Sequence, residues 1–241
     1  MKRLIGSLVI LFCAFSAIPA LAAAADDAAK ACAGGDPNPD KRIAACGKVL
    51  ATNPKQDAKI AWVFKARGNA YFSKGDLDKA VKDYDIAIRL DPRDSTALAN
   101  RGTMQMSQGK GALALADYNA ALKVNPKDTN VYSLRGFLYS RTGHLDLAIQ
   151  DYTTALKLDP KFADAHSGRG YAYYITKKYD LALADFDAAV KLAPQDPLSV
   201  YMRSLSYRKL GKKAQADKDL ATARKLDPKI EEELKSIGVA D

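Results

Sequence analysis

The sequence predicts an all-α solenoid of stacked antiparallel helix pairs, because three sets of residues recur with one period. Glycines, alanines and prolines each recur at the same fixed interval, and self-similarity of this kind is typical of repeat proteins. The recurring positions are Gly68, Gly102, Gly136 and Gly170, with Ser204 in step; Ala80, Ala114, Ala148, Ala182 and Ala216; and Pro92, Pro126, Pro160, Pro194 and Pro228.

Two amphipathic helices are predicted in each repeat. In the third, Leu145, Ala148, Ile149 and Tyr152 are spaced three and four residues apart, which places them on one helical face. The second helix ends before a proline, and the first ends near a glycine suited to a left-handed terminus. These glycines are Gly75, Gly109, Gly143 and Gly211. Small residues such as Gly68 and Ala80 let the two helices approach closely, while Tyr71 and Tyr84 supply bulk at the adjoining contact.

The large–Gly–Tyr–Ala–aromatic–Ala–Pro pattern resembles the tetratricopeptide repeat (TPR) family. The units are residues 61–94, 95–128, 129–162, 163–196 and 197–230, together residues 61–230. The resemblance implies a right-handed superhelix whose first helices line a concave groove. Three departures are local: Gln105 replaces a tyrosine, Lys177 replaces the turn glycine and Ser204 replaces the helix-crossing glycine.

Residues 1–22 have the three regions of a secretory signal peptide. Lys2 and Arg3 precede an apolar run, and small residues follow at Ala20 and Ala22. The run is shorter than the about 20 residues of a transmembrane helix, so we expect cleavage near Ala22 and no stable membrane span afterwards. Cys13 follows Phe12 inside the run, unlike a lipoprotein signal. The expected location is periplasmic or secreted.

Residues 23–60 are expected to form an N-terminal cap with a degenerate half-repeat. Residues 40–43 align with residues 78–81 as a second helix, preceded by a shortened helix over about residues 26–33. Cys32 and Cys46 would enter an oxidising compartment as an even pair, so we expect one disulfide. A metal half-site or a redox pair is the alternative, but neither a CxxC spacing nor a nearby His supports it. Residues 231–241 are expected to be a capping helix and tail, since a stack exposes an apolar face at each end.

The composition argues against an enzyme. Two His and three Cys without a cluster leave few means of building a metal site or a nucleophile–base pair, so we expect no metal, no cofactor and no catalytic residue. The net charge of +9 is consistent with an acidic partner or with a basic solvated surface. Export makes nucleic acid an unsuitable partner.

An arginine ladder accompanies the repeats, and each arginine is followed by an aspartate at one fixed separation along the chain. Equal numbers of opposite charges in fixed register predict structural ion pairs, with a phosphate-binding arginine stripe as the alternative. The arginines are Arg67, Arg101, Arg135, Arg169 and Arg203, and the aspartates are Asp83, Asp117, Asp151, Asp185 and Asp219. His166 occupies a large-residue position and is expected to pack, whereas His144 lies in a turn without a visible partner.

The family resemblance implies that the first helices bind a peptide or partner segment. The expected groove residues combine aromatic rings with cationic donors, which suits acidic or C-terminal peptide segments. They are Lys65, Asn69, Phe72, Asn100, Met106, Phe137, Arg141, Tyr171, Tyr174, Tyr201 and Arg208, with Trp62, Thr103, Leu205 and Lys209 beside them. Within this set, Lys65, Asn69 and Asn100 match three members of the carboxylate clamp that some family members use, but Asn130 and Leu134 do not continue it.

The predicted function is therefore a non-catalytic protein–protein interaction scaffold or adaptor in the bacterial periplasm. Its partner would be another protein or a peptide, and the sequence does not define an oligomeric state. The alternative is a cell-envelope accessory or assembly factor, associated with peptidoglycan or regulating a protease. Both remain fold-level inferences until a site is identified.

Overall fold

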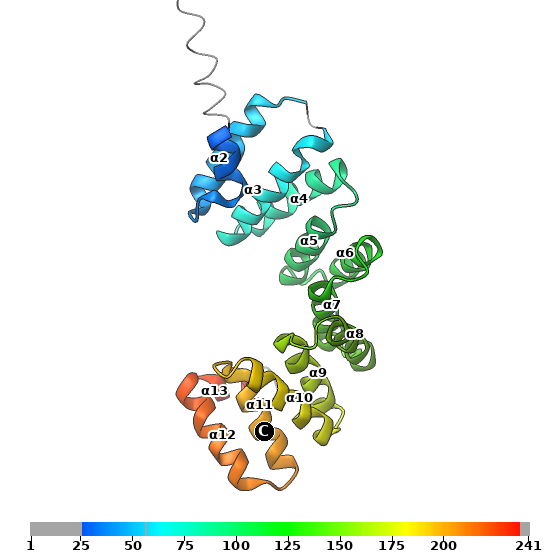
Figure 1. Cartoon of the computed structure of the whole chain (residues 1–241), viewed down its shortest axis with the longest axis vertical. Helices are drawn as coiled ribbons and strands as arrows, with labels where there is room; N and C mark the ends of the chain where they lie inside the picture. Colours follow the sequence, from blue (N-terminus) through cyan, green and yellow to red (C-terminus); the bar gives the residue numbers. More distant parts are fainter. Residues whose placement is uncertain (1–25, 56, 237–241) are drawn as a thin grey trace, which may run out of the picture. The chain divides into compact units, whose positions relative to one another are not determined.

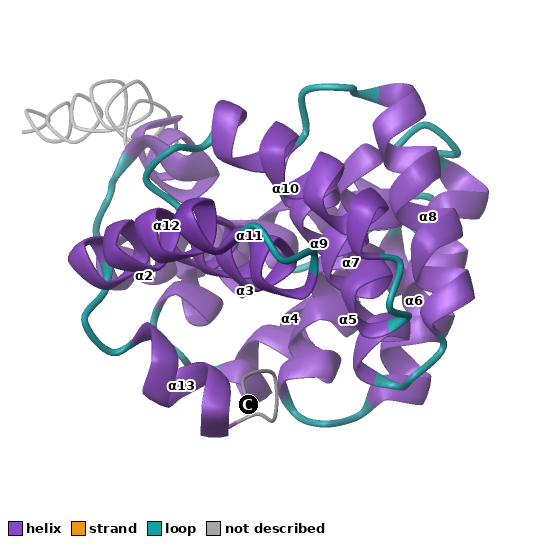
Figure 2. Cartoon of the chain, turned by 90° about the horizontal axis from the view of Figure 1, so that it is seen from below, coloured by secondary structure: helices purple, strands orange, loops and turns teal. Residues whose placement is uncertain are grey.

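The computed structural model describes residues 26–55 and 57–236, and every regular element in these ranges is a helix (Figure 2). The predicted signal peptide, residues 1–22, lies outside the described residues, as do residues 237–241 of the predicted tail. None of the described helices is both long and apolar enough to cross a bilayer. The chain divides after Gln108 into two compact units, which are described separately.

The first unit begins with the cap. Residues 26–30 are helical and lead into the π-helical turn η1 (Ala31–Gly35), which is followed by α2 (Pro39–Thr52) and η2 (Ala58–Ile60). Asn38 caps α2 by accepting hydrogen bonds from the backbone N–H groups of residues 40 and 41. A disulfide joins Cys32 to Cys46, both fully buried, with Cα atoms 4.7 Å apart. The unit continues with α3 (Ala61–Ser73), α4 (Leu77–Leu90) and α5 (Ser95–Ser107) (Figure 1).

The second unit contains eight described helices, in which each helix packs on the next. These are α6 (Gly111–Val124), α7 (Thr129–Arg141), α8 (Leu145–Leu158), α9 (Ala163–Ile175), α10 (Tyr179–Leu192), α11 (Pro197–Lys209), α12 (Lys213–Leu226) and α13 (Ile230–Ser236). The closest packing joins α7 to α8, α9 to α10 and α11 to α12. The helix-pair arrangement predicted from the period of the repeat is therefore present.

The turn within each pair has the predicted left-handed residue. Gly75, Gly109, Gly143 and Gly211 have φ angles of 78°, 75°, 80° and 72°. Lys177 holds the same place in the α9–α10 turn with a φ of 61°, so that turn keeps its geometry although it lacks glycine. An L-residue with a Cβ pays a conformational cost in this region that glycine avoids.

Close approach explains the glycine ladder. A Cβ built at Gly68 would lie 3.1 Å from the Tyr84 ring, and one at Gly136 would lie 3.2 Å from the Tyr152 ring. The prediction that these glycines let bulky rings of the second helix contact the first is confirmed. Ser204, which replaces glycine in the last repeat, is fully buried and donates its hydroxyl to the backbone oxygen of Tyr201 at 2.7 Å.

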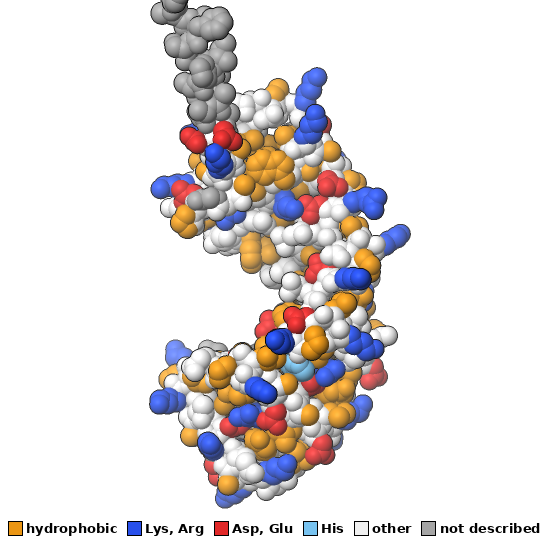
Figure 3. Space-filling model, in the orientation of Figure 1, with side chains coloured by type: hydrophobic (Ala, Val, Ile, Leu, Met, Phe, Trp, Pro, Cys, Tyr) orange, Lys and Arg blue, Asp and Glu red, His pale blue; other side chains and the backbone are white. Residues whose placement is uncertain are grey.

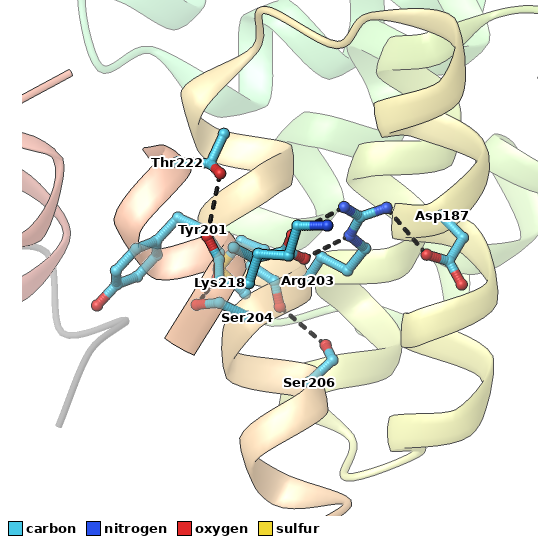
Figure 4. Close-up of polar contacts among 9 residues, drawn as sticks. Asp187, Tyr201, Arg203, Ser204, Ser206, Lys218 and Thr222 are labelled. Atoms are coloured by element: carbon cyan, nitrogen blue, oxygen red, sulfur yellow. Dashed lines mark hydrogen bonds and ion pairs between the residues drawn. The ribbon is translucent and has the colours of Figure 1, made fainter. Parts of the chain in front are cut away.

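The predicted arginine–aspartate pairs are also confirmed wherever both members lie in one unit. Arg67, Arg135, Arg169 and Arg203 donate through Nε to Asp83, Asp151, Asp185 and Asp219 at 2.6 to 2.8 Å. These hydrogen bonds raise the pKa of each of the four guanidinium groups. Arg203 also reaches Asp187, on the preceding helix α10, at 3.1 Å (Figure 4). The ladder therefore links neighbouring helices, and its arginines are occupied by the fold.

Both histidines make polar contacts that the sequence analysis missed. His166 does more than pack: Nδ1 lies 3.0 Å from Asp185 Oδ1, and Nε2 lies 3.1 Å from the Pro160 oxygen. His144 does have a partner, since its Nδ1 lies 3.0 Å from Thr142 Oγ1. The His166–Asp185 contact joins two helices, whereas the His144–Thr142 contact lies within one turn.

Candidate functional site

A groove in the second unit is the main candidate site. It has a volume of about 910 Å³ and lies against α7, α9 and α11. Its lining is formed by Ser133, Leu134, Phe137, Ser140, Arg141, Tyr152, Asp164, Ser167, Gly168, Tyr171, Asp196, Leu198, Met202 and Leu234. The structure thus brings together three residues expected on the concave surface: Phe137, Arg141 and Tyr171.

Phe137 and Arg141 form an aromatic and cationic wall. They lie one helical turn apart on α7, so their side chains share a face, and the Arg141 guanidinium lies 5.9 Å from the centre of the Phe137 ring. The Phe137 side chain is 45% exposed. Arg141 forms no ion pair with any residue that the structure describes, in contrast to the paired ladder arginines. This wall therefore presents an apolar surface beside an unneutralised charge.

The opposite charge in the groove comes from two aspartates in different situations. Asp196 caps α11, where its carboxylate accepts hydrogen bonds from the backbone N–H groups of Leu198 and Ser199. Asp164, in the first turn of α9, is exposed and has no ion-pair partner among the described residues. A ligand in the groove would therefore meet two charged groups, the Arg141 guanidinium and the Asp164 carboxylate, neither of which forms an ion pair with a described residue.

Tyr152 forms the floor of the groove. Its ring lies between two glycines, and a Cβ built at Gly168 would lie 2.3 Å from Tyr152 Cζ. Tyr152 is 2% exposed, and burial raises its pKa. The Ser140 Oγ, which also lines the groove, is buried without a hydrogen-bond partner among the described residues. Such an unsatisfied hydroxyl is costly unless a ligand or water bonds it.

Two residues predicted at the C-terminal end of the binding surface are buried. Tyr201 and Leu205 are only 3% and 8% exposed, because they pack with Ile230 and Leu234 of α13. Figure 4 shows the Tyr201 and Arg203 side chains leaving α11 in opposite directions. Met202 and Leu234 line the groove instead and were missed. The spacing of four residues between Ile230 and Leu234 was the available signal for a helix with a buried face.

Other predicted residues lie outside this groove. Tyr174 packs edge-on against Tyr179 with ring centres 5.5 Å apart. Arg208 and Lys209 are exposed near the end of α11 and do not line the groove. The prediction that these residues share one binding surface with Phe137 is therefore not met by the groove.

In the first unit, the three clamp-like residues bond to their own chain. Lys65 pairs with Asp94 at 2.6 Å, and Asn69 Oδ1 accepts hydrogen bonds from Tyr84 OH at 2.6 Å and from Asn100 Nδ2 at 3.0 Å. Since Asp94 balances the Lys65 charge, the carboxylate-clamp alternative loses its principal cation.

The remaining predicted residues of the first unit are partly accessible. Trp62 and Phe72 are 37% and 46% exposed, while Thr103 donates its hydroxyl to the Ala99 oxygen at 3.0 Å. Met106 is half-buried. These residues provide exposed aromatic surface, but the charged and amide groups beside them are engaged within the unit.

No group of three or more His, Cys, Asp or Glu side chains that could hold a metal ion occurs in the described part of the chain. Burial raises the pKa of Tyr171 in the groove, which keeps its hydroxyl protonated as a hydrogen-bond donor. The groove is therefore equipped for apolar contact, hydrogen bonding and charge pairing.

Comparisons with known proteins agree with this architecture. Sequence models of the TPR repeat match residues 68–109 and 102–143, and models of the tetratricopeptide repeat match residues 135–197 and 199–230. A search of curated proteins gives no match.

Solved structures share the fold at low identity. PilF from Pseudomonas aeruginosa has a TM-score of 0.74 at 16% identity, covering 86% of this chain and 93% of its own. A tetratricopeptide repeat protein from Parabacteroides merdae has a TM-score of 0.69 at 22% identity, covering 85% of this chain and 78% of its own. YrrB, described as a TPR protein with an unusual peptide-binding site, has a TM-score of 0.60 at 21% identity, covering 76% and 92%. With its repeat-wide sequence matches, its glycine contacts and its helix pairs, the chain belongs to the tetratricopeptide repeat family.

Proposed function

We propose that this protein is a non-catalytic scaffold or adaptor that binds a peptide or partner segment in the groove of the second unit. The observation that carries the proposal is the wall formed by exposed Phe137 and Arg141, whose charge has no partner among the described residues. Aromatic and arginine side chains supply most binding energy at protein interfaces, and an arginine forms strong charge-assisted bonds to carboxylates.

The chemistry of the groove supports binding rather than catalysis. Asp196 is engaged as a helix cap and Asp164 is exposed to solvent, and the described lining of the groove contains no His or Cys that could act with either carboxylate as a base or a nucleophile. The tyrosines have raised pKa values because of burial, which makes them poor nucleophiles at neutral pH. Function as an interaction module is also typical of the repeat family.

The proposal places the protein in the periplasm or outside the cell. It rests on the signal-peptide features of residues 1–22 and on the Cys32–Cys46 disulfide, which would persist in an oxidising compartment. On the face seen in Figure 3, Lys and Arg side chains are interspersed with acidic and apolar ones.

The test is a crosslinking capture from the native envelope. The protein is compared with a variant carrying Phe137→Ala, Arg141→Ala and Tyr171→Ala. A control carries Leu181→Ala and Lys191→Ala, which change exposed residues of α10 outside the groove. Proteins captured by the wild type and the control but not by the groove variant support the proposal. Equal capture by all three excludes the groove, and retention on insoluble peptidoglycan would favour the envelope-factor alternative.

A further inference from the structure

One end of the groove is bounded by the chain's own helix α13. Helix α13 packs on α11 and α12, and its Ile230 and Leu234, four residues apart, are 5% and 6% exposed. Leu234 lines the groove together with Met202, and the same cluster contains Tyr201 and Leu205. The surface that the sequence assigned to a partner is therefore covered here by an amphipathic helix.

The polar side of α13 shows which charges this end of the unit accepts. Glu231 Oε2 pairs with Arg224 Nε at 2.8 Å. The pKa of Glu231 is lowered by this hydrogen bond and by the charges of Arg224, Lys235 and Arg208. A carboxylate beside an aliphatic pair is thus complementary to the cations of α11 and α12 that act on Glu231, namely Arg208 and Arg224.

Few contacts hold α13 in place. It has seven residues, well below the length at which a helix is stable in water on its own. Its described buried side chains are Ile230 and Leu234, and its ion pair is solvent-accessible, with Arg224 55% exposed. Terminal elements with few buried contacts open more readily than the helix pairs of the core.

We propose that α13 is an internal occupant of the apolar surface at the end of the groove, where it covers Tyr201 and Leu205, and that the partner is a helical segment of the same chemistry, with aliphatic side chains four residues apart and a carboxylate between them. This proposal rests on the proposed function. The partner displaces α13, contacts Tyr201 and Leu205, and extends along the groove to the Phe137 and Arg141 wall. Because the Asp164 carboxylate would repel an acidic side chain beside it, the acidic residues of the partner belong beside Arg224, where Glu231 now lies, and beside Arg141.

The probe is a fluorescent peptide with the sequence of residues 228–236, measured by fluorescence anisotropy. It is titrated into the whole protein and into a variant carrying Ile230→Ala and Leu234→Ala, which weakens α13. We expect the variant to bind the peptide at least about tenfold more tightly, because the internal competitor is removed. A peptide with alanine in place of the isoleucine and leucine is the matched control and should not bind.

A second variant, Glu231→Gln, removes the ion pair without changing the buried side chains, and should raise the affinity by a smaller factor. Because unfolded protein could also bind an apolar peptide, both variants must show a cooperative thermal unfolding transition above the temperature of the titration. Equal affinity of the wild type and both variants would overturn the proposal. If the envelope capture still depends on Phe137 and Arg141 in that case, the proposed function stands and only the role of α13 falls.

Discussion

Gly168→Ala tests whether the close contact with Tyr152 shapes the groove. Alanine in the interior of a helix is more stable than glycine by about 1 kcal/mol when nothing obstructs its Cβ. At Gly168 the added Cβ would lie 2.3 Å from Tyr152 Cζ, and Tyr152 cannot retreat freely because its ring also contacts Gly136. Overpacking of this kind costs about 1–3 kcal/mol. We therefore expect a net destabilisation of up to about 2 kcal/mol, the difference between these two terms.

Substitutions at two other glycines serve as controls for the effect at Gly168. Gly47, inside α2, has no atom within 4 Å of a built Cβ, so Gly47→Ala should stabilise the protein by about 1 kcal/mol. At Gly136 a built Cβ would lie 3.2 Å from the Tyr152 ring, so Gly136→Ala should change the free energy of unfolding by close to zero. The free energy of unfolding of each of the three variants is measured by urea unfolding, monitored by circular dichroism. The reasoning is wrong if Gly168→Ala is as stabilising as Gly47→Ala, or if Gly168→Ala remains destabilising in a Tyr152→Ala background, where the obstruction is absent.

Four further predictions concern the turns, the ladder, the cap and pH. Lys177→Gly should stabilise the protein by about 0.5–1 kcal/mol in urea unfolding, because Lys177 has a φ of 61°, whereas Lys191→Gly inside α10 should destabilise it by about 1 kcal/mol. Arg169→Met should lower the free energy of unfolding by about 2–4 kcal/mol, because it leaves the 4% exposed Asp185 without its bidentate partner; Arg89→Met, at an exposed site, should change it by less than about 0.5 kcal/mol. Replacing Cys32 and Cys46 by alanine should cost about 3 kcal/mol, and reductant should then have no further effect on the thermal transition. Burial raises the pKa of Tyr84 to about 12, so its protonated form stabilises the fold below pH about 10, and about 2–3 kcal/mol should be lost as the pH rises from about 10 to 12; a Tyr84→Phe variant should lack this part of the alkaline unfolding curve.

Repetition explains why most of the fold could be predicted. Each helix pair is determined by local features that recur in register, such as Gly143 at the turn and Gly136 opposite Tyr152. The Arg135–Asp151 pair could be predicted for the same reason, because its fixed separation along the chain places both members between the two helices of one repeat. Within repeats of this kind, nearest-neighbour contacts make up nearly the whole structure.

The candidate site depended on contacts that repetition does not encode. Tyr201 and Leu205 are buried because α13 folds back onto α11, and nothing in the register of residues 197–230 requires that. Gly168 occupies a position held by Ala66, Asn100, Leu134 and Met202 in the other repeats, so its role emerged only with the Tyr152 ring beside it. Lys65 was expected to bind a ligand, but Asp94, which caps the first helix of the next repeat, neutralises its charge.

One register position differs between the two surfaces. Asn69 and Phe137 occupy the same place in their repeats. Asn69 Oδ1 accepts a hydrogen bond from the Tyr84 hydroxyl at 2.6 Å, so these two polar groups of the first unit are bonded to each other. Phe137 offers no hydrogen-bond acceptor; Tyr152 lies close to Gly168 of the next repeat, and the exposed Phe137 ring contacts the Arg141 guanidinium. The recurring ladders hold the repeats together, whereas Phe137 and Arg141, which do not recur in the other repeats, form the wall proposed to bind a partner.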